Sequence, residues 1–121
     1  MKILIVDDSV TVRSSEKKIL AGLGLNDVVE ATDGAMGLKM AFQEKPDLVL
    51  MDWDMPTLSG IEALKLLKAN PATEKTPVIM VTGSAGKEQI VEAIKLGATD
   101  YVIKPFTAET IHKKIVQLLI K

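Results

Sequence analysis

The chain has 121 residues, of which 47% are hydrophobic and 26% are charged, and this composition suits one soluble globular domain with a single core. Its 15 basic residues nearly balance its 16 acidic ones, which argues against nucleic acid as a partner because phosphate binding needs a concentrated basic face. The absence of cysteine excludes disulfides and thiolate metal sites, and no apolar run reaches the roughly 20 residues that span a bilayer. We therefore expect one cytoplasmic domain over residues 1–121, with no secretory signal and no membrane partner.

Short apolar runs recur along the chain and predict strands. In chain order they are ILIV (3–6), LVLM (48–51), VIMV (78–81) and YVI (101–103). Continuous runs of this length are typical of strands buried on both faces, as in a parallel sheet covered by helices. A weaker run, DVVEA (27–31), contains Glu30 and is therefore expected at an edge of the sheet.

Amphipathic stretches with helical spacing separate these strands. The apolar positions predicted to share a helix face are Val12, Ile19, Leu20 and Leu23, then Leu38, Ala41 and Phe42, then Ile61, Leu64 and Leu67, then Ile90 and Ile94, and finally Ile111, Ile115, Leu118 and Leu119. Gly24 and Gly97 stand where helix C-caps belong, and Pro46 and Pro77 precede the third and fourth strands.

Five strands alternating with five helices predict an α/β fold. Because crossovers between parallel strands are right-handed, few topologies remain possible. We expect a doubly wound five-stranded parallel sheet with the strand order 2-1-3-4-5, which is the flavodoxin-like (βα)5 arrangement. Ligands of such sheets bind beyond the carboxyl ends of the strands, where the strand order reverses.

Polar side chains collect at that predicted edge. Asp7 and Asp8 follow the first strand, Asp52 ends the third, Thr82 ends the fourth and Lys104 follows the fifth. Each has an ordinary explanation when taken alone, such as helix capping for Asp8 or a surface position for Lys104. Taken together they converge on one crevice, where three carboxylates would raise one another's pKa unless a cation offset them.

A hard divalent cation suits this cluster. Mg²⁺ prefers oxygen ligands and keeps several waters, so Asp8 and Asp52 can bind it directly and Asp7 through water. His112 stands alone in the last predicted helix, which gives no indication of zinc. A carboxylate beside Mg²⁺ and a lysine is also a plausible nucleophile toward phosphorus. Asp52, at the end of the most apolar strand, is predicted to be the attacking group.

Four motifs give the chain a family resemblance. They are ILIVDDS, LVLMDWDMPTLSG, VIMVTGSA and GATDYVIKPF, in this order and each at a predicted strand end. The chain resembles response-regulator receiver domains over nearly its whole length, and in particular single-domain members that act in chemotaxis. The resemblance implies that Asp52 accepts a phosphoryl group from a phosphohistidine on a histidine kinase or phosphotransfer protein. It also implies that Asp7, Asp8, Asp52 and the backbone carbonyl of Asp54 hold Mg²⁺.

The same resemblance assigns a switch. Thr82 would hydrogen-bond the new phosphoryl group, Lys104 would pair with it, and a cis peptide before Pro105 would aim the lysine. Tyr101 would turn inward when Thr82 moves, and the face over about residues 86–120 would then change shape and bind a downstream protein. Such a protein catalyses only its own phosphorylation and dephosphorylation, with no other substrate. Asp54 and Ser84 stand where family members vary and would tune the lifetime of the phosphate.

Two other functions fit parts of the pattern. A phosphatase of the haloacid dehalogenase type has Asp-x-Asp-x-Thr/Val after an apolar strand, which is close to Asp52-Trp53-Asp54. Pro56 stands at the fifth position of that motif, however, and the motif follows the third strand rather than the first. A receiver-like adaptor that acts by binding alone is the other alternative. Degenerate receivers usually lack an acidic ligand, the acceptor or the lysine, and none of these is missing here.

Overall fold

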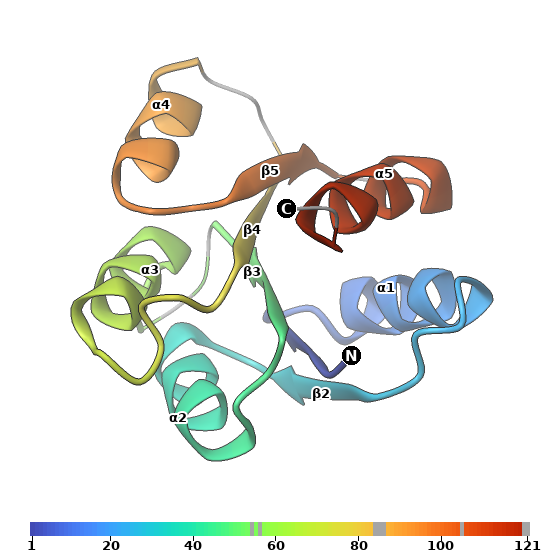
Figure 1. Cartoon of the computed structure of the whole chain (residues 1–121), viewed down its shortest axis with the longest axis horizontal. Helices are drawn as coiled ribbons and strands as arrows, with labels where there is room; N and C mark the ends of the chain where they lie inside the picture. The colour runs from blue at the N-terminus through green and yellow to red at the C-terminus, as the bar shows by residue number, and fades with distance from the viewer. Residues whose placement is uncertain (54, 56, 84–86, 105, 120–121) are drawn as a thin grey trace.

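Five parallel strands form one sheet, and helices cover both of its faces (Figure 1). The computed structural model describes residues 1–53, 55, 57–83, 87–104 and 106–119. The elements are β1 (Ile3–Val6), α1 (Val10–Gly22), β2 (Val28–Ala31), α2 (Gly34–Glu44), β3 (Leu48–Asp52), α3 (Gly60–Ala69), β4 (Val78–Thr82), α4 (Lys87–Lys95), β5 (Asp100–Ile103) and α5 (Ala108–Leu119). The strand order β2-β1-β3-β4-β5 confirms the predicted doubly wound fold.

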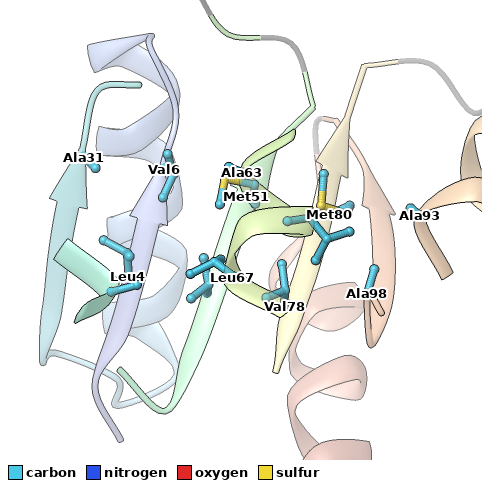
Figure 2. Packing of buried hydrophobic residues seen from close by; sticks show 13 residues of the cluster. Leu4, Val6, Ala31, Met51, Ala63, Leu67, Val78, Met80, Ala93 and Ala98 are labelled. Carbon is cyan, nitrogen blue, oxygen red and sulfur yellow. The ribbon is translucent and has the colours of Figure 1, made fainter. Parts of the chain in front are cut away.

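The two faces of the sheet bury separate cores. Side chains alternate along each strand, so Leu4 and Val6 of β1 point to one face while Ile3 and Ile5 point to the other. Helices α2, α3 and α4 cover the first face, and α1 and α5 cover the second (Figure 1). Figure 2 shows the first core, in which Met51 and Met80 of the central strands pack beside Ala63 and Leu67 of α3. Within the described part of the chain, no helix is long and apolar enough to cross a membrane.

The helix faces were predicted less accurately than the strands. Phe42 is 40% exposed and Ile94 is 46% exposed, so both predictions of burial were wrong. Ala41 of α2, which was predicted to share that face, is buried, and on α4 the buried residue is Ala93, which was not predicted. The buried stripe on these helices is therefore narrower than the apolar spacing indicated.

The helix ends follow from local chemistry. Ser9 caps α1, and its Oγ accepts a hydrogen bond from the backbone N of Val12 at 3.2 Å. Gly24 and Gly97 have φ angles of +81° and +108°, which confirms the predicted C-terminal stops after α1 and α4. Because Ser9 caps this helix, the carboxylate of Asp8 is left available at the carboxyl edge of the sheet.

Gly60 sets the distance between α3 and the end of β3. A Cβ atom added at Gly60 would overlap the carbonyl oxygen of Asp52. We therefore expect Gly60→Ala to lower the free energy of unfolding by about 1–3 kcal/mol, measured by urea denaturation, because backbone must shift to admit the methyl group. Gly22→Ala is the matched control, since a Cβ at Gly22 meets nothing within 4 Å. Equal stability of the two variants would contradict this account of Gly60.

Candidate functional site

The predicted site residues do meet at the carboxyl ends of the strands. Backbone hydrogen bonds fix them there: the N–H of Asp7 donates to Ala31 O at 3.1 Å, and the N–H of Lys104 donates to Thr82 O at 2.7 Å. Asp52 is the last residue of β3, which lies between β1 and β4 in the middle of the sheet. The strand register therefore brings residues that are far apart in the sequence to one edge.

Lys104 bridges two buried carboxylates. Its Nζ lies 2.9 Å from Asp7 Oδ2 and 2.9 Å from Asp52 Oδ1. Asp7 is 1% exposed and Asp52 is 5% exposed, whereas the Lys104 side chain is 26% exposed and reaches solvent. An ion pair shielded in this way is much less screened by salt than a surface pair. The positive charge of Lys104 offsets the repulsion between the two buried carboxylates.

The charges shift one another's pKa values. Burial raises the pKa of Asp52 above its ordinary value, the hydrogen bond from Lys104 opposes that rise, and the charges of Asp7 and Asp8 add to it. Burial acts to lower the pKa of Lys104, but its bonds to Asp7 and Asp52 outweigh burial and raise it. Lys104 is therefore a permanent cation at neutral pH.

Three carboxylates at this edge could hold a divalent metal ion. Oxygens of Asp7, Asp8 and Asp52 all lie within 4.8 Å of one another. Opposite ligands of octahedral Mg²⁺ are separated by about 4.2 Å, so small side-chain movements would complete such a site. Asp7 already accepts a hydrogen bond from Ser9 N on Oδ1 at 2.9 Å and faces Lys104 with Oδ2. Asp8 is exposed and Asp7 is buried. Direct binding by Asp8 and binding through water by Asp7 stay predictions.

Thr82 and Tyr101 lie on one face of the sheet. The register pairs Met80 with Tyr101 and Thr82 with Ile103, so the side chains of Thr82 and Tyr101 project on the same side of neighbouring strands. Thr82 is 4% exposed, and Tyr101 is partly buried with Lys114 Nζ at 5.5 Å from its ring centroid. The two residues predicted to form the switch therefore lie on the same sheet face of neighbouring strands.

Some predicted positions fall outside the described residues. These are Asp54, whose carbonyl was expected to bind metal, Pro105, expected to aim the lysine, and Ser84. The predicted output face over about residues 86–120 is described between 87 and 104 and between 106 and 119.

Sequence reasoning missed two residues beside the site. The guanidinium of Arg13 donates to the backbone oxygen of Asp7 at 2.7 Å and pairs with Glu30 at 3.1 Å, which ties α1 to β2 below the acidic cluster. Glu16, on α1, is only 4% exposed. The signal for Glu16 was visible: a charged residue stands four positions after Val12 and four before Leu20, in the middle of an apolar helix face.

Metal binding at this cluster can be measured with the sole tryptophan. Trp53 follows Asp52 directly, so its fluorescence is expected to change when Mg²⁺ is added. Asp8→Asn removes a carboxylate of this cluster and should weaken Mg²⁺ binding by at least the roughly 10–100-fold that loss of an outer-shell partner of a ligand costs. Asp47→Asn, at the opposite end of β3, should leave the affinity unchanged. Equal affinities for both variants would exclude Asp8 as a ligand.

The fold and this site together define a class of protein. The chain matches the response regulator receiver domain over residues 3–116, and it belongs to this family. It is 44% identical over 115 residues to chemotaxis protein CheY-3 of Vibrio cholerae, covering 95% of this chain and 88% of that protein.

Solved structures agree with this assignment. The chemotaxis response regulator CheY4 of Vibrio cholerae superposes with a TM-score of 0.88 at 32% identity, covering 96% of each chain. The response regulator domain of Thermotoga maritima CheB superposes with a TM-score of 0.83 at 34% identity, covering 97% of this chain and 94% of that one. The predicted resemblance is confirmed, and the chain belongs with receivers rather than with haloacid dehalogenase phosphatases.

Proposed function

We propose that this protein is a response regulator that accepts a phosphoryl group on Asp52. The observation that carries the proposal is the position of Asp52: it is buried at the end of the central strand, 2.9 Å from the Lys104 ammonium and within the acidic cluster of Asp7 and Asp8. A nucleophilic carboxylate, a fixed cation and ligands for a divalent metal are the parts that phosphoryl transfer to an aspartate needs.

The reaction follows from these parts. A carboxylate oxygen of Asp52 forms the new O–P bond while the P–N bond of a phosphohistidine donor breaks, and the electron pair of that bond returns to the imidazole. Asp8 and Asp52 would hold Mg²⁺, with Asp7 acting through water and the Asp54 carbonyl as a further ligand. The metal ion supplies neutralisation of the charge on the phosphoryl oxygens. Lys104, already beside Asp52 Oδ1, pairs with the transferred group.

The output is a change of the surface built by α4, β5 and α5. An acyl phosphate brings a charge on the order of −1.5 to −2 to the end of β3, and Thr82 moves to donate a hydrogen bond to it. Tyr101, on the same sheet face as Thr82, then turns inward. A protein target that binds the phosphorylated and unphosphorylated forms of this surface with different affinities responds to the phosphorylation of Asp52.

The partners follow from the family and the relatives. We assign the donor as a histidine kinase or phosphotransfer protein and the output as a protein target in chemotaxis, such as the flagellar motor, because CheY-3 and CheY4 are chemotaxis proteins. We also assign this exchange to the cytoplasm, because kinases draw on ATP there. The protein is a phosphoacceptor that catalyses only its own phosphorylation and dephosphorylation.

An intact-mass spectrum tests the proposal. Incubation with acetyl phosphate and Mg²⁺ should add one phosphoryl group to the wild-type protein and none to Asp52→Asn. Chelation of the metal with EDTA should also prevent the addition. If the wild type gains nothing, a beryllofluoride titration read by Trp53 fluorescence separates fast hydrolysis, in which the adduct still forms, from an adaptor that never binds phosphate.

A further inference from the structure

Glu16 occupies a position where a charged residue is costly. It lies on the face of α1 that packs against the second core, between Val12 and Leu20, and it is 4% exposed. Its Oε2 has no hydrogen-bond partner among the described residues. Because a buried carboxyl group without a partner destabilises a fold, this side chain calls for an explanation beyond packing.

Glu16 shares a small pocket with the lysine of the site. The pocket has a volume of about 110 Å³, and its polar lining comes from Ser15, Glu16 and Lys104 while Val81 and Phe106 contribute apolar surface. This volume admits several water molecules, each of which needs two or more polar partners. Glu16 therefore borders this space from α1 and Lys104 borders it from the loop after β5, while Asp7 and Asp52 bind the Lys104 ammonium at the sheet edge.

The charges around Glu16 favour its neutral form. Burial raises its pKa from 4.5 to about 8, the charges of Asp7 and Asp52 add to the rise, and the charge of Lys104 opposes it. On α5, which packs beside α1, Glu109, His112 and Lys113 are exposed.

The remaining charged groups near α1 are engaged elsewhere. Lys114 of α5 pairs with Asp100 at 3.0 Å, and on α1 both Arg13 and Lys17 pair with Glu30. Lys18 is exposed. The groups that act on Glu16 are therefore those of the phosphoacceptor site.

We propose that Glu16 is a positioning residue for phosphorylation, acting on Asp52 through Lys104 across the pocket that the two side chains share. This inference rests on the proposed function. While its carboxyl group is neutral, Lys104 is held by Asp7 and Asp52 in the position that receives the phosphoryl group. Once ionised, the carboxylate competes for the ammonium and adds negative charge beside a site that must accept more of it. Ionisation of Glu16 therefore opposes phosphorylation.

The pH profile of phosphorylation tests the proposal. The rate with acetyl phosphate and saturating Mg²⁺ is measured between about pH 7 and pH 9.5 for the wild type, Glu16→Gln and Glu16→Leu. For each protein, the phosphorylation rate at pH 9.5 is divided by the rate at pH 7. We expect this ratio to be about tenfold smaller in the wild type than in either Glu16 variant, which corresponds to a coupling of one pKa unit. Glu109→Gln, at a glutamate whose side chain is 81% exposed, should follow the wild type. Parallel profiles for all four proteins would overturn the proposal.

A second readout does not depend on phosphorylation. The ¹⁵Nζ signal of Lys104 is followed by NMR over the same pH range in the wild type and in Glu16→Gln. It should move with a midpoint near the pKa of Glu16, about 8, in the wild type only. A Lys104 signal that behaves identically in both proteins refutes the coupling. The Lys104 signal can also move as expected in a wild-type protein that neither acetyl phosphate nor beryllofluoride modifies. That result would support the coupling between Glu16 and Lys104 and refute the proposed function.

Discussion

Replacement of Lys104 by methionine is expected to slow the phosphorylation of Asp52 by about 10²–10³-fold, the usual effect of removing one preorganised charge partner of a transition state. The ammonium lies 2.9 Å from Asp52 Oδ1, where the phosphoryl oxygens gather charge during transfer. Methionine keeps the length and the apolar stem of the side chain but cannot neutralise that charge. The rate is measured with acetyl phosphate and saturating Mg²⁺, so that metal affinity does not enter.

The same substitution should destabilise the metal-free protein. Without Lys104, Asp7 and Asp52 remain buried with no ion-pair partner, which lowers the free energy of unfolding by about 1–3 kcal/mol at neutral pH after allowance for the solvent that reaches Lys104. Loss of the lysine also raises the folded-state pKa of Asp52 further. The folded variant then keeps a proton on Asp52 that the unfolded chain releases. The loss of stability is therefore small below the ordinary aspartate pKa of about 4 and grows as the pH rises.

Magnesium should reverse this loss of stability. At a concentration of 100 times its Kd, a ligand that binds only the folded state adds about 2.7 kcal/mol. Lys113→Met, at a lysine whose side chain is 71% exposed, is the control and should change neither rate nor stability. If Lys104→Met is phosphorylated at the wild-type rate, the lysine has no part in the transfer.

Replacement of Glu16 by glutamine is expected to stabilise the protein by about 3 kcal/mol at pH 7 relative to its effect near pH 4.5. The physical reason is that the folded state holds Glu16 protonated, with its pKa raised to about 8 from 4.5. Glutamine has nearly the same shape and does not ionise. The stability of the variant therefore does not depend on pH through residue 16.

The direction of the pH dependence can be worked out for Glu16. Below the unfolded pKa of 4.5 the group is protonated in both states, and the full stability is present. Above it, the unfolded chain releases a proton that the folded chain keeps, and wild-type stability falls by about 1.4 kcal/mol per pH unit until the folded pKa is passed. Carboxylates far from Glu16, such as Glu109 on the exposed face of α5, contribute equally to both proteins and cancel in the difference.

Urea denaturation at several pH values between 5 and 8 measures this difference. The gap between Glu16→Gln and the wild type should widen steadily with pH, whereas Glu109→Gln should track the wild type. A gap that stays constant with pH would mean that Glu16 ionises normally in the folded state.

Much of the fold and the site could be predicted because it depends on local signals. The apolar runs marked the strands, and alternation of strands with helices left few topologies. Asp7, Asp52 and Lys104 could therefore be placed at one sheet edge from the sequence alone. The glycines at 24 and 97 likewise marked the ends of α1 and α4, because only a residue that tolerates positive φ continues the chain there.

What could not be predicted depends on packing between elements. Phe42 and Ile94 have the spacing of buried residues but are exposed, whereas Ala93, which was not predicted, contacts the core. Glu16 was visible as a charge on an apolar face, yet its proximity to Lys104 depends on how α1 lies over β4 and the loop after β5. Such distances between elements are not encoded in the period of any one helix.

The most direct test of the account is to locate the phosphoryl group in the chain. Borohydride reduces an acyl phosphate to an alcohol, so a phosphorylated aspartate becomes homoserine and can be identified by peptide mass spectrometry. After treatment with acetyl phosphate and Mg²⁺, the account predicts homoserine at position 52 and at no other aspartate. Homoserine at Asp54, Asp7 or Asp8, or modification that persists in Asp52→Asn, would contradict it.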